Sequence, residues 1–197
     1  MNQCFNHLDI ILGSQSPRRI QLLKEIGLNF SLYTIDVEEV FPENLSAIET
    51  AVYLSELKAS VFPEKDFKEN SILITADTVV SLNNHLLGKP ANKSEAIQML
   101  NLLSGKSHEV ISAFTLRSKQ NLKSFYAITE VSFKKLDMSE IDYYIEHFQP
   151  FDKAGAYGIQ EWIGKIGIEK IKGSYFNVMG LPVHKVYAEL CTFELFK

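Results

Sequence analysis

The apolar run LDIIL at residues 8–12 passes through a short polar junction into the pattern of an amphipathic helix. The run has the length and composition of a buried strand. Ser16 followed by Pro17 is a common helix start, and Gly27 follows the apolar stripe where a helix would end. A strand that turns directly into a helix favours an α/β fold.

The rest of the chain continues this mixture of elements. Ser46–Glu49 is a capping box, which predicts a helix that ends before Pro63. The segment 71–82 is rich in β-formers but is interrupted by the polar triplet ADT, and Asn83–Asn84 predicts a hairpin turn. We also expect strands at 30–35, 85–87, 108–118 and 124–135, helices at 92–105, 138–147 and 183–195, and a loop at 173–182. The order predicts a mixed, twisted β-sheet flanked by helices.

Length and charge limit the classes of protein. The 197 residues suffice for a single domain with a sizeable core, and we expect one domain over 1–197. A net charge of −4 argues against binding along a nucleic-acid backbone. No apolar stretch is long enough to span a membrane, and the N-terminus lacks the pattern of a signal peptide. Cys4 and Cys191 show no metal-ligand spacing, which favours a reduced protein of the cytoplasm.

The junction GSQSPRR, residues 13–19, concentrates groups that bind anions. The first turn of a helix presents unpaired N–H groups and partial positive charge. Ser14 and Ser16 add hydroxyl groups, and Arg18 and Arg19 add planar cations suited to phosphate oxygens. On this stretch alone, an ordinary capped helix with two solvated arginines is an equally good interpretation.

Two further motifs carry charged groups in unusual surroundings. Asp77 lies inside an apolar β-rich run, where a carboxylate is costly unless it meets a cation, a donor or a cleft. It fits a metal ligand or a proton acceptor, with a turn aspartate as the alternative. Lys89 lies in the tight motif LGKP, where it fits a phosphate ligand or a surface turn. The pair Glu38–Glu39 by itself indicates only a solvated loop.

The glycine-containing segments DKAGAYGIQ at 152–160 and GSYFNVMGLP at 173–182 permit close approach to a flat ligand. Gln160 offers one donor and one acceptor group, which reading the edge of a base requires. Two ordinary loops with aromatic packing are the alternative. Taken together, the cationic junction, the acid, the lysine and these segments are the parts that a triphosphate hydrolase needs.

The order of the motifs SQSPRR, EE, YLSELKA, ADTVV, LGKP, LSGKSHEV, DKAGAYGIQ and GSYFNVMGLP resembles the Maf family over nearly the whole chain, from about Ile10 to Pro182. The resemblance implies a nucleoside triphosphate pyrophosphatase that releases a nucleoside monophosphate and pyrophosphate. It also implies an α/β fold with two lobes around a central cleft, and a divalent metal, usually Mg²⁺ with Mn²⁺ as the alternative. Related proteins are often homodimers, but the sequence shows no diagnostic patch.

The resemblance also implies roles for particular residues. Asp77 corresponds to the proton acceptor that activates water, and Glu39 and Asp77 to the residues that hold the metal. The implied catalytic set is Asp77, Lys89 and Glu39, and the implied substrate-binding set is Ser14, Ser16, Arg18, Arg19, Lys58, Thr78 and Gln160.

The form AGAYGIQ resembles the branch that prefers dTTP and UTP, with Arg18, Thr78 and Gln160 at the positions associated with substrate choice. Glu161 departs from the glycine that family members often carry there, which leaves another nucleotide, such as CTP, 7-methyl-GTP or a modified pyrimidine nucleotide, as an alternative substrate. A nucleotide-binding regulator of cell division with weak catalysis is a second alternative.

Overall fold

The computed structural model describes residues 5 and 7–193. Within these residues, seven strands form one mixed sheet in the order β2-β1-β3-β5-β6-β7, and β4 pairs with β3. The strands are β1 (Asp9–Leu12), β2 (Ser31–Leu32), β3 (Ser71–Leu82), β4 (His85–Leu87), β5 (Ser107–Arg117), β6 (Leu122–Phe133) and β7 (Ile168–Lys172). The predicted mixed sheet flanked by helices is confirmed.

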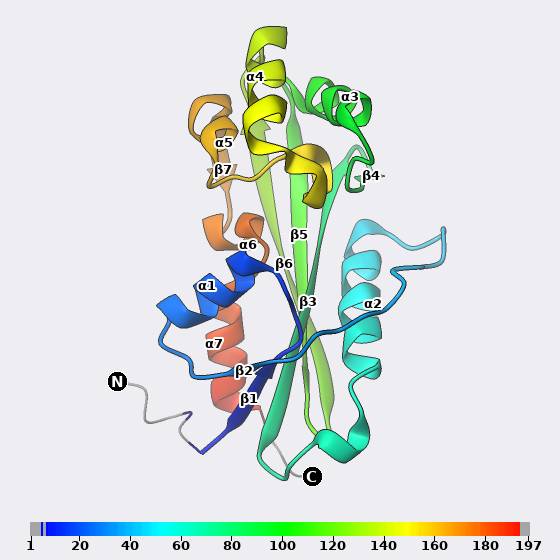
Figure 1. Ribbon diagram of the computed structural model, residues 1–197, viewed down its shortest axis with the longest axis vertical. Coiled ribbons are helices and arrows are strands. Elements are labelled where there is room, and N and C mark those ends of the chain that lie inside the picture. The colour runs from blue at the N-terminus through cyan, green and yellow to red at the C-terminus, as the bar shows by residue number, and fades with distance from the viewer. Residues whose placement is uncertain (1–4, 6, 194–197) are drawn as a thin grey trace.

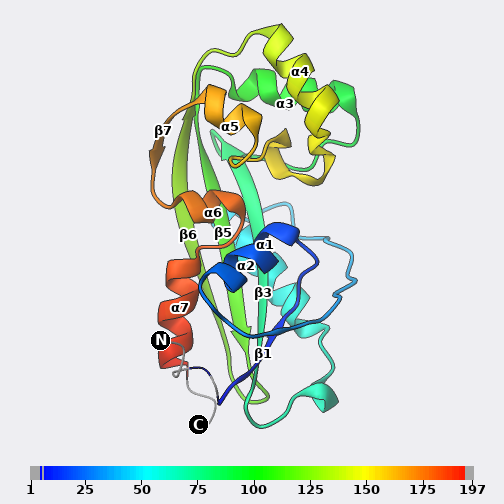
Figure 2. The ribbon, with the colours of Figure 1, turned by 60° about the vertical axis from the view of Figure 1, so that its left-hand side comes forward.

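Helices cover both faces of this sheet and form an upper lobe (Figures 1 and 2). The helix α2 lies on one face, α1, α6 and α7 lie on the other, and α3, α4 and α5 gather at the upper ends of the long strands. The helices are α1 (Pro17–Glu25), α2 (Ala47–Ser60), α3 (Lys93–Leu103), α4 (Met138–Phe148), α5 (Trp162–Gly167), α6 (Tyr175–Met179) and α7 (Val183–Thr192), with short 3₁₀ turns η2 (Glu64–Asp66), η3 (Pro150–Asp152) and η4 (Ala154–Ala156).

The strand β3 is the centre of the core. Nearly all of its residues are buried, because α2 packs on one of its faces and the α1 side of the molecule covers the other. Alternate side chains therefore enter different clusters: Ile74 packs with Leu23 of α1, whereas Val79 packs with Ala51 of α2.

One edge of β3 is left open, and this positions the site. The strand β1 pairs with β3 only over residues 71–74, and β4 pairs with the same edge only over residues 80–82. Between them, residues 75–79 have no strand partner on this side, although β5 pairs with the opposite edge throughout. Side chains from both faces of the sheet can therefore reach the space beside this edge.

Local signals in the sequence set several element boundaries as predicted. The capping box at Ser46 forms, with its hydroxyl accepting from the amide of Glu49. Asn92 caps α3 in the same way. Asn83 and Asn84 have φ values of 50° and 65°, as a two-residue hairpin turn requires.

Other predictions about local structure were wrong. The triplet ADT does not interrupt β3, which is continuous, so Asp77 is not a turn aspartate. The predicted strand at 30–35 shortens to Ser31–Leu32, and the predicted loop at 173–182 contains α6. The sequence did not indicate α5 or β7. The described part of the last helix ends at Thr192, and predicted residues 194–195 lie outside the described residues.

No helix in the described part of the chain combines the length and the apolarity that crossing a membrane requires.

Candidate active site

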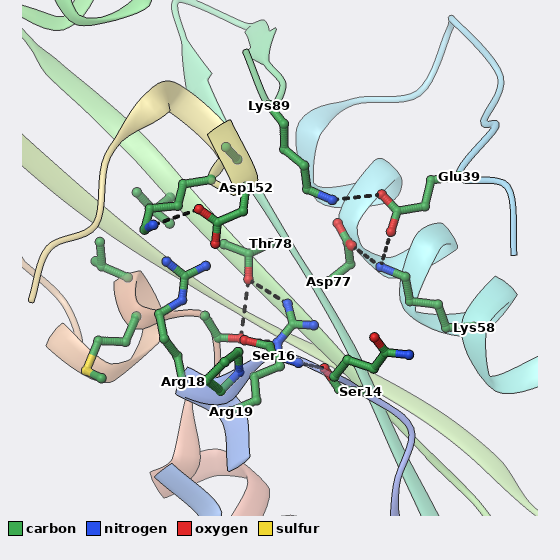
Figure 3. A pocket seen from close by; sticks show the side chains of 18 of the residues that line it. Ser14, Ser16, Arg18, Arg19, Glu39, Lys58, Asp77, Thr78, Lys89 and Asp152 are labelled. Atoms are coloured by element: carbon green, nitrogen blue, oxygen red, sulfur yellow. Dashed lines mark hydrogen bonds and ion pairs between the residues drawn. The ribbon is translucent and has the colours of Figure 1, made fainter. Parts of the chain in front are cut away.

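A cavity of about 920 Å³ opens beside the unpaired edge of β3. It lies between the β1–α1 junction, α2, the segment 152–161 and the end of α6 (Figure 3). All ten residues predicted for the site line it: Ser14, Ser16, Arg18, Arg19, Glu39, Lys58, Asp77, Thr78, Lys89 and Gln160. Residues from six separate parts of the chain thus meet at one cavity.

The β1–α1 junction presents the N-terminus of α1 to the cavity. Ser16 is the N-cap residue, but its side chain does not cap the helix, contrary to the sequence prediction. Its backbone N–H instead donates to Oγ of Ser14 at 3.2 Å. The amides of the first turn are therefore not satisfied by this cap and remain suited to an anion.

The two arginines of the junction differ in their partners. Arg19 donates through Nη1 to the carbonyl of Ala76 at 2.8 Å, through Nε to that of Gly180 at 2.9 Å, and through Nη2 to Oγ1 of Thr78 at 3.2 Å. Arg19 thus supplies a donor to a backbone carbonyl on the open edge of β3, as a neighbouring strand would do in a complete sheet. Burial lowers the pKa of its guanidinium, and the charge of Asp77 opposes this shift.

Arg18 makes no hydrogen bond to any described residue, and its guanidinium points toward the carboxylate of Asp152 (Figure 3). It is half-buried and lines the cavity. Of the two neighbouring cations, Arg18 is therefore the one whose donors remain available to a ligand.

On the other side of the cavity, two carboxylates share one ammonium group. Nζ of Lys58 lies 2.5 Å from Oδ1 of Asp77 and 2.8 Å from Oε1 of Glu39. Asp77 is buried, whereas Glu39 is exposed and also lies 3.5 Å from Nζ of Lys89. Burial would raise the pKa of the Glu39 carboxyl, but the hydrogen bond and charge of Lys58, with Lys89, hold it below the usual value.

A second charged network lies in the segment 152–161, and the sequence analysis missed it. Nζ of Lys153 lies 2.7 Å from Oδ1 of Asp152 and 3.1 Å from Oε1 of Glu161. Lys153 is buried and lines the cavity with both acids. Its position inside the motif DKAGAYGIQ was the available signal, but a lysine beside an aspartate is common on exposed loops.

Two polar side chains complete the cavity wall. Oε1 of Gln160 is buried and accepts no hydrogen bond from the described residues. The hydroxyl of Thr78 lies within hydrogen-bond distance of Oγ of Ser112 and the carbonyl of Gly180, in addition to Arg19. Gln160 therefore keeps an unpaired acceptor in the cavity wall, whereas Thr78 fixes the wall around Arg19.

The sequence of this chain is similar to those of known proteins, and the similarity identifies its family. The model of a family described as Maf-like protein matches residues 9–193. The chain belongs to the Maf-like proteins. Proteins named dTTP/UTP pyrophosphatase are similar over most of their length. The relative from Flavobacterium johnsoniae is 48% identical over 183 residues, which are 93% of this chain and 94% of the relative. The relative from Cytophaga hutchinsonii is 50% identical over 188 residues (94% and 85%), and that from Bacteroides fragilis 47% over 182 residues (92% and 94%).

Membership in the Maf-like proteins confirms the resemblance drawn from the motifs, and the ten implied residues do converge. The further charged residues that line the cavity, Asp36, Asp152, Lys153 and Glu161, were not among them.

Proposed function

We propose that this protein hydrolyses nucleoside triphosphates, with dTTP and UTP preferred, to the nucleoside monophosphate and pyrophosphate. The observation that carries the proposal is that the buried carboxylate of Asp77 faces the same cavity as the N-terminus of α1 and the available guanidinium of Arg18. A phosphate chain and a proton acceptor are thereby brought together. The names of the relatives support the same reaction.

The phosphates bind, in this proposal, between the α1 junction and Lys89. Ser14, Ser16 and the first amides of α1 supply donors, and Arg18 supplies two N–H groups in one plane. Five cationic and five anionic side chains line the cavity: Arg18, Arg19, Lys58, Lys89 and Lys153 against Asp36, Glu39, Asp77, Asp152 and Glu161. Because this balance does not neutralise a triphosphate, the substrate requires additional positive charge.

Glu39 and Asp77 fit the role of metal ligands. Both carboxylates lie within 3 Å of a single ammonium group, so these two residues would together hold a divalent cation in its place. Their oxygens are the ligands that Mg²⁺ prefers, with Mn²⁺ as a substitute. No group of three or more His, Cys, Asp or Glu side chains converges among residues 5 and 7–193, so phosphate and water would complete the shell. When bound, the metal neutralises phosphate charge during attack.

Asp77 accepts the proton of the attacking water. Its Oδ1 pairs with Lys58 in the structure, at the place that a metal would take, whereas Oδ2 makes no hydrogen bond in the described part of the chain and is left to accept the proton. The water oxygen forms a bond to the α-phosphorus while the bond from that phosphorus to the α,β-bridging oxygen breaks. The proton passes to Asp77, and pyrophosphate leaves with the bond electrons.

Gln160 reads the base. Its buried acceptor Oε1 matches the N3–H of thymine or uracil, whereas cytosine presents an acceptor at N3. Thr78, the other predicted selectivity residue besides Arg18, acts in this proposal by fixing Arg19 and Gly180.

Pyrophosphate release from a panel of nucleotides with Mg²⁺ tests this function. We expect dTTP and UTP to be hydrolysed, and Asp77→Asn to abolish most of the turnover while the exposed control Asp66→Asn leaves it unchanged. Preferential release from CTP or 7-methyl-GTP would favour another substrate. Tight binding of dTTP without any release would favour the regulator instead.

We further propose that the chain works as one Maf-like domain, because the long strands of a single sheet extend from the helices of the upper lobe to those at the other end of the molecule. The cytoplasmic location and the homodimer stay predictions.

A further inference from the structure

The network around Glu161 ties the segment 152–161 to the upper lobe. One oxygen of the Glu161 carboxylate, Oε1, pairs with Nζ of Lys153 at 3.1 Å. The other, Oε2, accepts a hydrogen bond from the hydroxyl of Tyr144, a fully buried residue of α4. Both oxygens of one side chain are thus engaged, one within the segment and one by a helix of the lobe.

Tyr144 continues the network back to the segment. The backbone N–H of Gly158 donates to the Tyr144 hydroxyl oxygen at 3.0 Å. Burial and the neighbouring Glu161 both raise the pKa of Tyr144, so its hydroxyl keeps the proton that it donates. Because the backbone N–H of Glu161 donates to the carbonyl oxygen of Gly158 at 3.0 Å, Gly158, Tyr144 and Glu161 form a closed chain of hydrogen bonds in the wall of the cavity.

Gln160 lies inside this closed chain. It is the residue before Glu161, and its side-chain nitrogen Nε2 would lie 3.1 Å from a Cβ atom added at Gly158. The Cδ atom of Glu161 would lie 2.8 Å from the same Cβ, so both side chains pack against Gly158. The backbone that aims Gln160 into the cavity is held on both sides by the network, while its Oε1 is left without a partner among the described residues.

We propose that Glu161 is a positioning residue that sets base selectivity, because through Tyr144 and Lys153 it fixes Gln160 against the base. This inference rests on the proposed function, and it gives a role to the residue that departs from the family pattern. A base that offers N–H to Oε1 then gains from an acceptor that is already oriented. A base without that donor leaves the buried acceptor unpaired.

The test compares selectivity in two variants and a control. Tyr144→Phe removes the hydroxyl that links Glu161 to Gly158 and keeps the ring. Glu161→Gln keeps the shape and an acceptor for Tyr144 but removes the charge that holds Lys153. The control, Tyr143→Phe, removes the hydroxyl of the neighbouring exposed tyrosine, whose ring stacks on His147 and lies tilted against the ring of Trp162.

We expect Tyr144→Phe to lower the ratio of kcat/KM for dTTP to that for CTP about tenfold, and Glu161→Gln to lower it less. The loss should come from a higher KM for dTTP with a nearly unchanged kcat. Calorimetry should show the same loss in the preference for dTMP over dCMP, which binding alone determines. Tyr143→Phe should leave both ratios unchanged.

The outcomes separate the two proposals. If the wild-type protein releases no pyrophosphate from any nucleotide, the proposed function is wrong and this inference falls with it. If the wild type prefers dTTP and both variants keep that preference, the inference alone is overturned. An equal loss of kcat/KM for dTTP and CTP in the variants would also overturn it, because a structural role moves all substrates together.

Discussion

Nζ of Lys58 lies 2.5 Å from Oδ1 of Asp77. The same ammonium group also lies 2.8 Å from Oε1 of Glu39, so it occupies the space between the two carboxylates that fit a divalent metal. The side chains of Lys58 and Asp77 are only 13% and 10% exposed, so water screens their interaction weakly. In this arrangement, a metal that bridges the carboxylates must displace the lysine.

The first prediction follows from that competition. Lys58→Met should bind Mn²⁺ at least about tenfold more tightly than the wild type without nucleotide, because the competing charge is gone. Electron paramagnetic resonance of Mn²⁺ measures the affinity independently of turnover. Lys89→Met is the matched control, since Lys89 lies 3.5 Å from Glu39 but makes no ion pair with Asp77 in the described structure. Equal affinity in Lys58→Met and the wild type would contradict the competition.

The second prediction separates the two neighbouring arginines. Arg19→Met should lower stability by about 2–4 kcal/mol, because it leaves the carbonyls of Ala76 and Gly180 without their donors. Arg18→Met should leave the melting temperature nearly unchanged and raise KM for the nucleotide, because its guanidinium makes no hydrogen bond to any described residue. Thermal denaturation and steady-state kinetics on both variants decide this. Comparable destabilisation by the two substitutions would show that Arg18 also supports the fold.

The sequence predicted those parts of the fold that local chemistry determines. The capping residues Ser46 and Asn92 and the turn at Asn83–Asn84 each act within about four residues, so their patterns are readable. The continuity of β3 was not readable, because the cost of burying Asp77 is offset by Lys58 from α2.

The candidate site shows the same limit. The residues of the junction 13–19 predicted an anion site, but an ordinary capped helix explained them equally well. The other site residues were predicted only from the order of the family's motifs. The network of Glu161, Lys153 and Tyr144 was missed because its members come together only through the packing of α4 against the segment 152–161. Neither the aspartate–lysine pair nor a tyrosine inside a helix marks such a contact in one sequence.

The third prediction concerns pH. His108 is buried, with Nε2 at 2.7 Å from the hydroxyl of Tyr157, and burial lowers its pKa from 6.5 to about 4. Between pH 4 and 6.5, His108 is therefore protonated in the unfolded chain and neutral in the folded protein. The contribution of His108 to the free energy of unfolding is fully present above pH 6.5. It falls as the pH drops toward 4, by about 3 kcal/mol in all.

Urea denaturation at pH 7 and at pH 4.5 measures that dependence. His108→Gln, which keeps a polar partner for Tyr157, should lose this part of the dependence, whereas the exposed control His85→Gln should retain it. Parallel pH profiles for His108→Gln and the wild type would assign the acid sensitivity to other groups.

The fourth prediction tests how tightly the backbone beside Gln160 is packed. A Cβ atom added at Gly164 of α5 would lie 1.9 Å from the carbonyl oxygen of Ile159, a contact that only movement of the backbone can relieve. Gly164→Ala should therefore shift the turn that precedes Gln160 and raise KM for dTTP several-fold, in addition to destabilising the fold by about 1–3 kcal/mol. Gly88→Ala is the matched control, because a Cβ atom there meets no atom within 4 Å. Kinetics at a temperature well below both melting transitions separates the two effects. An unchanged KM in Gly164→Ala would mean that the turn yields without moving Gln160.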